Sequence, residues 1–152
     1  MRFLLQVARD ASVTTGNGVV GAIDHGYVLF AGFCQGDNEE ICDRMIKKML
    51  ALRIFKDENG KTNLSIRDVG GSILCISQFT LYANCTHGNR PSFTDSLGRE
   101  YAEPLYEYLL KRLVEEGIDT KQGEFGEHMD VRFCNDGPFT VMLDSDVIFS
   151  KG

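Results

Sequence analysis

The sequence predicts one mixed α/β domain over residues 1–152, with about seven or eight strands and two helices. Three observations support this prediction. Short apolar runs alternate with glycine-marked turns, two longer segments carry apolar residues at helical spacing, and no linker or repeat divides the chain. A domain of this length buries roughly 70% of its extended-chain surface, so we expect it to fold without a disulfide or a metal.

The first part of the chain predicts strands. Residues 1–13 read as one long strand, and residues 15–18 (Thr-Gly-Asn-Gly) are a strong hairpin turn signal. Residues 19–23 are predicted to form a second strand that pairs with the first. A second turn is expected at residues 24–26 (Asp-His-Gly), and residues 27–33 are predicted to form a short apolar strand. Three strands joined by tight turns indicate an antiparallel meander.

The first predicted helix follows Asn38, whose side chain can cap it. Two glutamates come next, in the first turn, where carboxylates suit the helix dipole. One face is apolar at helical spacing and carries Ile41, Met45, Met49 and Leu52. Farther along, residues 72–77 are apolar on both sides and predict a central strand.

The second predicted helix spans about residues 99–116, and Gly117 fits its C-terminal end. Its core side is expected to carry Tyr101, Leu105, Tyr108, Leu109 and Leu113. Two final strands are predicted near residues 129–134 and 139–144. The segment between them, Asn-Asp-Gly-Pro, predicts a turn.

The charge balance excludes a broad class of partners. The chain carries 16 Lys and Arg residues against 22 Asp and Glu, a formal net charge of −6. That balance argues against a protein that coats nucleic acid with a basic face, but not against contact with one end of a nucleic acid. All of the net charge lies in residues 77–152, mostly in the last third, so a site in the middle of the chain can be near neutral.

No cofactor, metal site or membrane span is expected. No run reaches 18 consecutive apolar residues and the first residues do not resemble a signal peptide, which favours a cytoplasmic protein. The five cysteines form no Cys-x-x-Cys pair, which predicts reduced thiols and no zinc site. The histidines His25, His87 and His128 lie in turn-like or polar contexts that are typical of surface residues.

Two short segments break the local pattern, and such places often hold functional residues. Residues 77–81 (Ser-Gln-Phe-Thr-Leu) end the buried run with hydroxyls and an amide, although a strand that simply reaches the surface looks the same. Residues 135–140 (Asn-Asp-Gly-Pro-Phe-Thr) are a turn by default. The peptide bond before proline can also be cis, because the cis form is only about 0.5–1 kcal/mol less stable than the trans form. No hydrolase elbow, zinc-protease motif or phosphate loop accompanies them.

These two segments resemble the two signature motifs of the D-aminoacyl-tRNA deacylases, the family of D-tyrosyl-tRNA deacylases. The resemblance continues, in the right order, over residues 11–13, 52–55, 88–93, 102–106 and 123–129. It implies the deacylase-type fold, in which mixed, largely antiparallel sheets form a barrel-like arrangement and two helices pack on one side. Several segments in order are far more specific than a single pentapeptide.

The resemblance also implies an activity. Family members hydrolyse the ester between a D-amino acid, or glycine, and the 3′ end of tRNA. They are homodimers in which a cis Gly-Pro peptide, here Gly137-Pro138, enters the partner's site and excludes L-amino acids. The implied catalytic residues are Gln78, Phe79 and Thr80. The implied substrate-binding residues are Ser77, Phe125, Met129, Gly137, Pro138 and Thr140.

The mechanism that the resemblance implies needs no activated side chain. Thr80 as a covalent nucleophile is the weaker option, because a threonine hydroxyl needs activation and no base–nucleophile pair is evident. In the family mechanism, the 2′-hydroxyl of the tRNA helps to activate water. The protein would position the ester and stabilise the developing oxyanion with main-chain N–H groups around Phe79 and Thr80.

Two departures from the family pattern lie near the implied gate. The family usually has Gln-Arg-Val near its start, and that arginine helps to fix the Gly-Pro loop; this chain has Val7 there, with Arg9 two residues on. Phe139 stands where valine is usual. These changes leave open a relaxed deacylase that acts on glycyl- or L-alanyl-tRNA. A catalytically silent dimer that binds the tRNA end or a protein is the alternative from another class.

Overall fold

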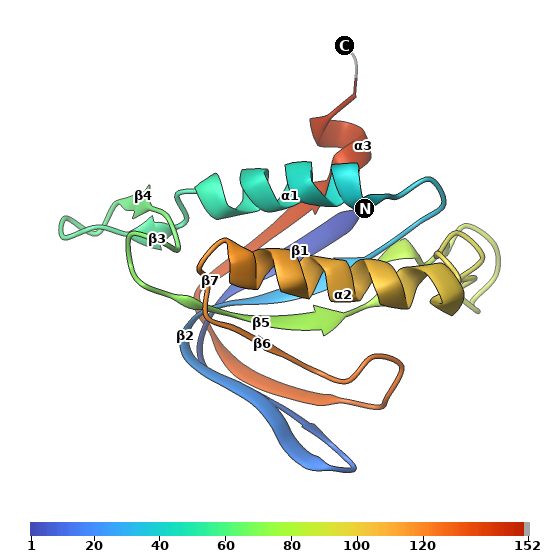
Figure 1. The fold of residues 1–152 in the computed structure, drawn as a ribbon, viewed down its shortest axis with the longest axis horizontal. Helices are drawn as coiled ribbons and strands as arrows, with labels where there is room; N and C mark the ends of the chain where they lie inside the picture. Colours follow the sequence, from blue (N-terminus) through green and yellow to red (C-terminus); the bar gives the residue numbers. More distant parts are fainter. Residues whose placement is uncertain (151–152) are drawn as a thin grey trace.

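A five-stranded mixed sheet supports the other elements in the computed structural model, which describes residues 1–150 (Figure 1). In spatial order its strands are β6 (Thr120–Gln122), β5 (Ser72–Ser77), β2 (Gly18–Gly32), β1 (Arg2–Thr15) and β7 (Asp130–Asp144). A small second sheet pairs β3 (Phe55–Lys56) with β4 (Thr62–Leu64). The helices are α1 (Glu39–Ala51), α2 (Arg99–Glu115), the short α3 (Ser145–Ile148) and a 3₁₀ helix, η1 (Phe79–Tyr82). Residues 151–152, which the one-domain prediction includes, lie outside the described part.

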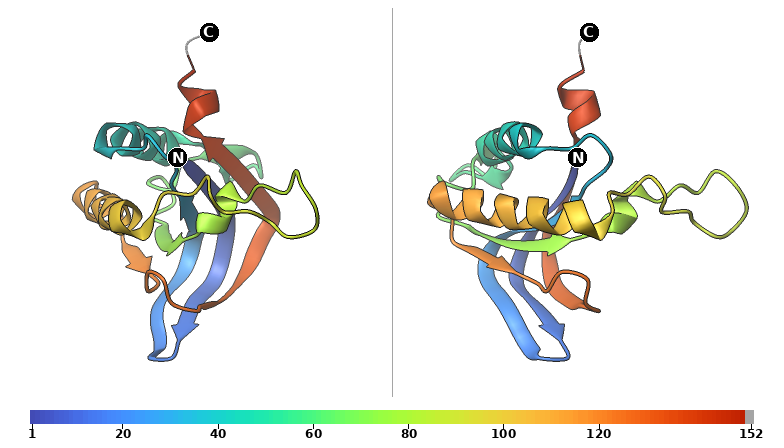
Figure 2. Two further views of the ribbon diagram at one scale, coloured as in Figure 1. Left: turned by 90° about the vertical axis from the view of Figure 1, so that its right-hand side faces the viewer. Right: turned by 45° about the vertical axis from the view of Figure 1, so that its right-hand side comes forward.

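Both pairing directions occur in the main sheet. β1 pairs antiparallel with β2 and with β7, whereas β5 pairs parallel with β2 and with β6. The edges are β6 and β7, so the sheet is open and twisted instead of closed into a barrel (Figure 2). The mixed α/β class, with two main helices on one side of the sheet, is confirmed.

The two main helices begin and end close to their predicted positions. Asn38 caps α1, with its Oδ1 accepting a hydrogen bond from the Ile41 N–H at 2.9 Å. α2 ends just before Gly117, which adopts a φ of +80°. The two helices run side by side over one face of the sheet, and the Tyr106 hydroxyl of α2 donates to the Cys75 carbonyl of β5 at 2.8 Å.

The predicted core side of α2 is wrong at Tyr101, whose side chain is 64% exposed. The buried stripe of α2 instead consists of Ala102, Leu105, Tyr106, Leu109, Leu110 and Leu113. Each residue turns the helix by about 100°, so Tyr101 lies one step outside the stripe that begins at Ala102.

The predicted meander is also wrong, because β2 runs without a break through residues 24–26. Gly26 lies inside this strand with a φ of +142°, and a Cβ there would overlap the main chain of Ser72 at the start of β5. Glycine in the interior of a strand often marks such a close approach of another backbone. Glycine is therefore required at position 26 by the close packing of β5 and not by a turn.

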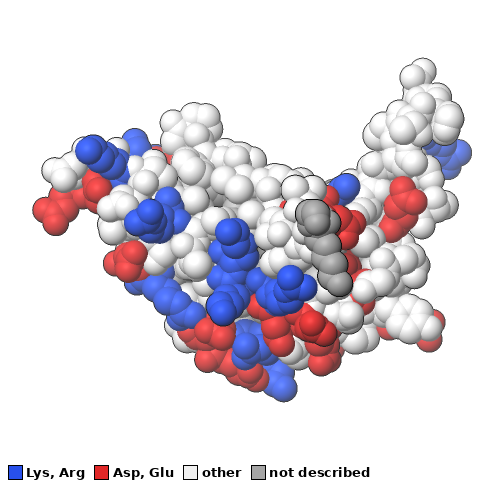
Figure 3. All heavy atoms as spheres, turned by 90° about the horizontal axis from the view of Figure 1, so that it is seen from above, with Lys and Arg blue, Asp and Glu red and all other residues white. Residues whose placement is uncertain are grey.

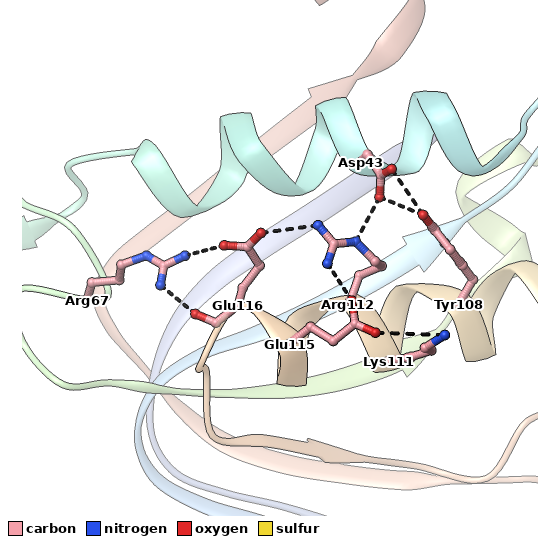
Figure 4. Close-up of polar contacts among 7 residues, drawn as sticks. All are labelled: Asp43, Arg67, Tyr108, Lys111, Arg112, Glu115 and Glu116. Atoms are coloured by element: carbon pink, nitrogen blue, oxygen red, sulfur yellow. Dashed lines mark hydrogen bonds and ion pairs between the residues drawn. The ribbon is translucent and has the colours of Figure 1, made fainter.

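A polar network joins α1, α2 and the segment after β4 (Figure 4). The Arg112 Nε of α2 donates to Asp43 of α1 at 3.0 Å, and the Tyr108 hydroxyl donates to the same carboxylate at 2.9 Å. Glu116 accepts from Arg112 at 3.1 Å and from Arg67 at 2.8 Å. On the face seen in Figure 3, positive and negative side chains lie next to one another, and no patch of one sign covers that face.

The five cysteines are all free thiols, of which Cys42 and Cys75 are buried. Within residues 1–150, no group of His, Cys, Asp or Glu side chains is arranged to hold a metal ion. In the same part of the chain, none of the helices has the length and apolar character that crossing a membrane requires.

Gly26→Ala tests the close approach of β2 and β5. The positive φ and the overlap with the Ser72 main chain should lower the free energy of unfolding by about 2 kcal/mol or more. Gly16→Ala is the matched control, because a Cβ at this turn position meets no atom within 4 Å. Urea denaturation of both variants measures the difference, and equal stability would contradict the packing described above.

Candidate active site

The end of β5 brings the motif at residues 77–81 to an opening beside the sheet. β5 is an inner strand with parallel neighbours on both sides, and its residues 73–76 are buried. Beyond Ser77, the Gln78 N–H donates to the Ala31 carbonyl at 2.8 Å and the chain turns into η1. A Cβ at Gly32 would lie 2.9 Å from the Gln78 carbonyl oxygen, so the motif packs tightly against β2.

A cavity of about 370 Å³ opens at this point, with Ser77, Gln78 and Phe79 in its lining. The loop before α2, the first turns of α2 and the segment before β7 supply the rest of the wall, including Phe93, Ser96, Leu97, Arg99, Phe125 and Gly126. Three predicted residues of one motif and Phe125 from a distant part of the chain therefore share one cavity.

Aromatic rings stand at the mouth of this cavity. Phe79 is 56% exposed, and its ring meets the Phe93 ring edge-on with centroids 5.1 Å apart. The Ser96 hydroxyl donates to the Phe79 carbonyl at 2.9 Å, which ties η1 to the loop before α2. Exposed aromatic faces of this kind are suited to stacking against a nucleic-acid base.

The Thr80 hydroxyl is not activated by a base. The Gln78 Nε2 donates a hydrogen bond to Thr80 Oγ1. Among the described residues, no hydrogen bond joins Thr80 to a histidine or a carboxylate. Both side chains can orient a polar substrate group, but they do not form a nucleophile–base pair.

Phe125 packs on α2 at the back of the cavity. Its ring centroid lies 5.7 Å from that of Tyr106, and the Arg99 guanidinium lies 5.5 Å from the Phe125 ring on another side. Burial raises the pKa of the Tyr106 phenol, which therefore stays neutral at physiological pH. The wall at Phe125 is thus apolar, with one cation at its edge.

Met129 lines a second, smaller cavity of about 230 Å³ together with Ser77, Gln78 and Phe79. The two cavities share Ser77, Gln78, Phe79 and Gly126, while Phe125 lines only the larger one and Met129 only the smaller one. Both predicted residues therefore lie beside the motif, and their role as a wall of one substrate pocket stays a prediction.

β7 is continuous where the sequence predicts two strands and a turn. Both halves pair with β1, where Thr140 lies opposite Gln6 and Asn135 lies opposite Ala8. Residues 136–139 therefore face Val7 alone and form a bulge. The predicted turn is wrong because the two halves bond to a shared neighbour and not to each other.

Side chains at the base of the bulge hold it in place. The Asn135 Oδ1 accepts from the Phe139 N–H at 3.1 Å, and its Nδ2 donates to Thr140 Oγ1 at 3.1 Å. The Gln6 Nε2 donates to the same Thr140 oxygen at 3.2 Å. Gly137 and Pro138 are exposed at the tip, and the peptide bond between them is cis, the form that the resemblance implies.

The bulge lies beside Val7, the position at which the family usually has an arginine. Val7 lines a cavity of about 270 Å³ with Gly137 and Phe139. Arg9 lies 3.5 Å from the Asp136 carboxylate and donates to Cys134 Sγ at 3.3 Å. An arginine therefore does reach the bulge, from two residues farther along β1.

The bulge and the motif cavity are far apart in one chain. From β5 to β7 the sheet crosses three strand spacings, about 14 Å. Ser77 lies opposite Ala31 on β2, whereas Val7, beside the bulge, lies opposite Tyr27. Gly137, Pro138 and Thr140 therefore do not join Ser77, Gln78 and Phe79 within one chain.

Several cavity residues were not singled out from the sequence. Phe93, Ser96 and Arg99 lie in or beside the loop before α2 and contact the motif or Phe125. Phe93 belongs to a segment of the family resemblance, but the sequence around an aromatic residue in a polar loop does not indicate which residue it will contact. Only the fold brings that loop to the end of β5.

The comparisons with known proteins agree with this geometry. Residues 4–144 match the family model described as D-Tyr-tRNA(Tyr) deacylase. A D-aminoacyl-tRNA deacylase from Halalkalibacterium halodurans is 50% identical over 145 residues, which cover 95% of this chain and 99% of the relative.

Two solved structures share the fold. The structure of the c-Myc DNA unwinding element binding protein matches with a TM-score of 0.88 and 36% identity, over 95% of this chain and 98% of that one. A probable eukaryotic D-amino acid tRNA deacylase matches with a TM-score of 0.82 at 18% identity, over 93% and 97%, and this likeness concerns the fold alone. With a family match over residues 4–144 and 50% identity over 145 residues to a relative that is matched over 99% of its length, the chain belongs to the D-Tyr-tRNA(Tyr) deacylase family.

Proposed function

We propose that this protein is a D-aminoacyl-tRNA deacylase, a hydrolase that cleaves the ester between a D-amino acid and the 3′ end of tRNA. One observation carries the proposal beyond family membership: residues 77–79 of the motif border a cavity whose mouth presents the exposed ring of Phe79, and Thr80 follows directly in η1. A terminal adenosine can stack at such a mouth while its ester reaches Gln78 and Thr80. We place the reaction in the cytoplasm, where charged tRNA is used.

The proposed mechanism relies on the substrate for activation. Thr80 has no basic partner among the described residues, so the 2′-hydroxyl of the terminal ribose would help to activate the attacking water. The main-chain N–H groups of Phe79 and Thr80 would stabilise the oxyanion, because the first N–H groups of a helix have no acceptor within it. An aminoacyl ester is already reactive, so positioning and two donors can suffice.

We further propose that the protein acts as a homodimer whose subunits exchange their Gly137-Pro138 bulges. The separation of the bulge from the cavity within one chain supports supply from a partner, as does the exposure of Gly137 and Pro138. In such an arrangement the main-chain carbonyls of the bulge would hold the substrate's amino group. An L side chain would then clash, whereas a D side chain or the hydrogen of glycine would fit.

Glycyl-tRNA is therefore a second proposed substrate. The contact of Arg9 with Asp136 supports a fixed gate despite Val7. A relaxed enzyme that also accepts L-alanyl-tRNA stays as the second candidate, because Phe139 changes the volume beside Gly137.

Deacylation of four charged tRNAs tests the proposed activity. D-tyrosyl-tRNA should lose its amino acid at least about a hundred-fold faster than L-tyrosyl-tRNA, because only the L side chain meets the gate. Glycyl-tRNA should be cleaved and L-alanyl-tRNA should survive. Rapid cleavage of L-alanyl-tRNA would identify the relaxed enzyme, and binding of tRNA without any cleavage would identify the silent module.

Thr80→Ala tests the mechanism. A positioning role predicts a fall in kcat of less than about a hundred-fold, whereas the loss of a nucleophile costs on the order of a million-fold. Thr86→Ala removes another exposed threonine hydroxyl, which contacts Asn84 and not the motif, and it should leave kcat unchanged. An inactive Thr80→Ala enzyme, together with an acyl-enzyme in the wild type by mass spectrometry, would contradict the mechanism.

Mixed dimers test the exchange of bulges. Ser77→Trp should fill the cavity, and Gly137→Trp should place an indole in the partner's cavity, so each variant alone should be inactive. Co-expressed chains should regain about one quarter of wild-type activity, because half of the dimers would have one intact site of two. No recovery in dimers verified by sedimentation would show that each chain uses its own bulge.

A further inference from the structure

Arg2, at the start of β1, has three partners at the place where β1, η1 and the end of β7 meet. Its Nη1 donates to the Leu81 carbonyl of η1 at 2.8 Å, and its Nε donates to Asp144 Oδ2 at 2.9 Å. The guanidinium also lies 4.5 Å from the centroid of the Tyr82 ring. About one third of the Arg2 side chain is exposed, so these contacts are partly shielded from water.

The 3₁₀ helix needs such support because it is only four residues long. Its own turn is closed by a 3.3 Å hydrogen bond from the Leu81 N–H to the Gln78 carbonyl and by a 3.0 Å bond from the Ala83 N–H to the Thr80 carbonyl. Single 3₁₀ turns have poor hydrogen-bond geometry and little stability of their own. The carbonyl of Leu81, near the end of the helix, has no partner within it and accepts from Arg2 instead.

Asp144 fixes the orientation of Arg2 from the other side. The two residues lie opposite each other in the β1–β7 pairing, and Asp144 also accepts from the Asp146 N–H at the start of α3 at 3.0 Å. Figure 1 shows this end of the sheet, where β7 leads into α3 beside the N-terminus. The hydrogen bond with Asp144 raises the pKa of Arg2, so the guanidinium stays charged.

We propose that Arg2 is a positioning residue for the reaction: through the Leu81 carbonyl and the Tyr82 ring, it sets the orientation of the η1 turn that presents Phe79 and Thr80. The proposal rests on the function proposed above, because Phe79 and Thr80 matter only if that turn meets the ester. Arg2 itself touches no substrate. Its effect is on the alignment of two exposed groups, Phe79 and Thr80, which Ser96 and Gln78 also contact.

The fork of the guanidinium is essential to this role. Arginine can donate to a carbonyl and to a carboxylate in fixed relative directions while its plane lies against a ring. A lysine at this position keeps the charge but has a single ammonium group, so it cannot reproduce all three contacts. Arg2→Lys therefore separates geometry from charge.

Arg67 offers a matched control. It also joins a main-chain carbonyl and a carboxylate across elements, with 2.6 Å to the Glu116 carbonyl and 2.8 Å to Glu116 Oε2 (Figure 4). It lies on the helical side, away from the lining of both cavities that border the motif. Any general cost of converting a bridging arginine to lysine should appear equally in Arg67→Lys.

Steady-state deacylation of D-tyrosyl-tRNA by the full chain provides the first readout. Arg2→Lys should lower kcat about ten- to a hundred-fold with little change in KM, because misalignment by about 1 Å is that costly. Arg67→Lys should stay within about two-fold of wild type, and the two variants should have similar melting temperatures. An inactive wild type would refute the proposed function, whereas an active wild type with equal kcat in both variants would refute the role of Arg2.

A fluorescent probe provides a second readout that does not depend on activity. The chain contains no tryptophan, so Phe79→Trp places a single indole on the η1 turn. In this background, Arg2→Lys should lower the fluorescence anisotropy of the indole and Arg67→Lys should not. Unchanged anisotropy in the Arg2 variant would show that η1 is held without Arg2 and would overturn the proposal.

Discussion

The structure depends on the two antiparallel ladders of β1. This strand pairs with β2 along one side and with β7 along the other, and the helices pack on the sheet that results. The register with β2 sets Gly26 against β5, and the register with β7 leaves four residues opposite Val7. A slip of one residue in either ladder would turn core side chains outward and move both the bulge and the end of β5.

The chemistry of the cavity depends on which side chains lie at the end of β5. β5 arrives buried between two parallel neighbours, so its first polar groups appear only where it leaves the sheet at Ser77 and Gln78. The result is a site of hydroxyls, an amide, aromatic rings and main-chain donors. Such a site suits a substrate that brings its own hydroxyl and an ester that is already reactive, and it tolerates a chain with a net charge of −6.

Two arginines, one on α2 and one on β1, perform comparable structural tasks. Arg112 joins α2 to α1 through Asp43, while Arg2 joins β1 to η1 and to the end of β7. In each case the fork of the guanidinium meets groups on separate elements, which a point charge cannot do with the same directionality. Arg9 makes a looser contact of this kind with Asp136 in the bulge.

The sequence by itself determined the local elements and the identity of the motif, because these depend on neighbours along the chain. Helical spacing and the cap at Asn38 located α1, and the apolar run at residues 72–77 located β5. Tertiary structure decided what depends on distant partners: that Gly26 accommodates β5 instead of a turn, that β7 bulges because both its halves bond to β1, and that Phe93 joins Phe79. It also decided that the Gly137-Pro138 bulge and the cavity are separated by two strands, since a sequence pattern carries no information on which strands will lie between two motifs.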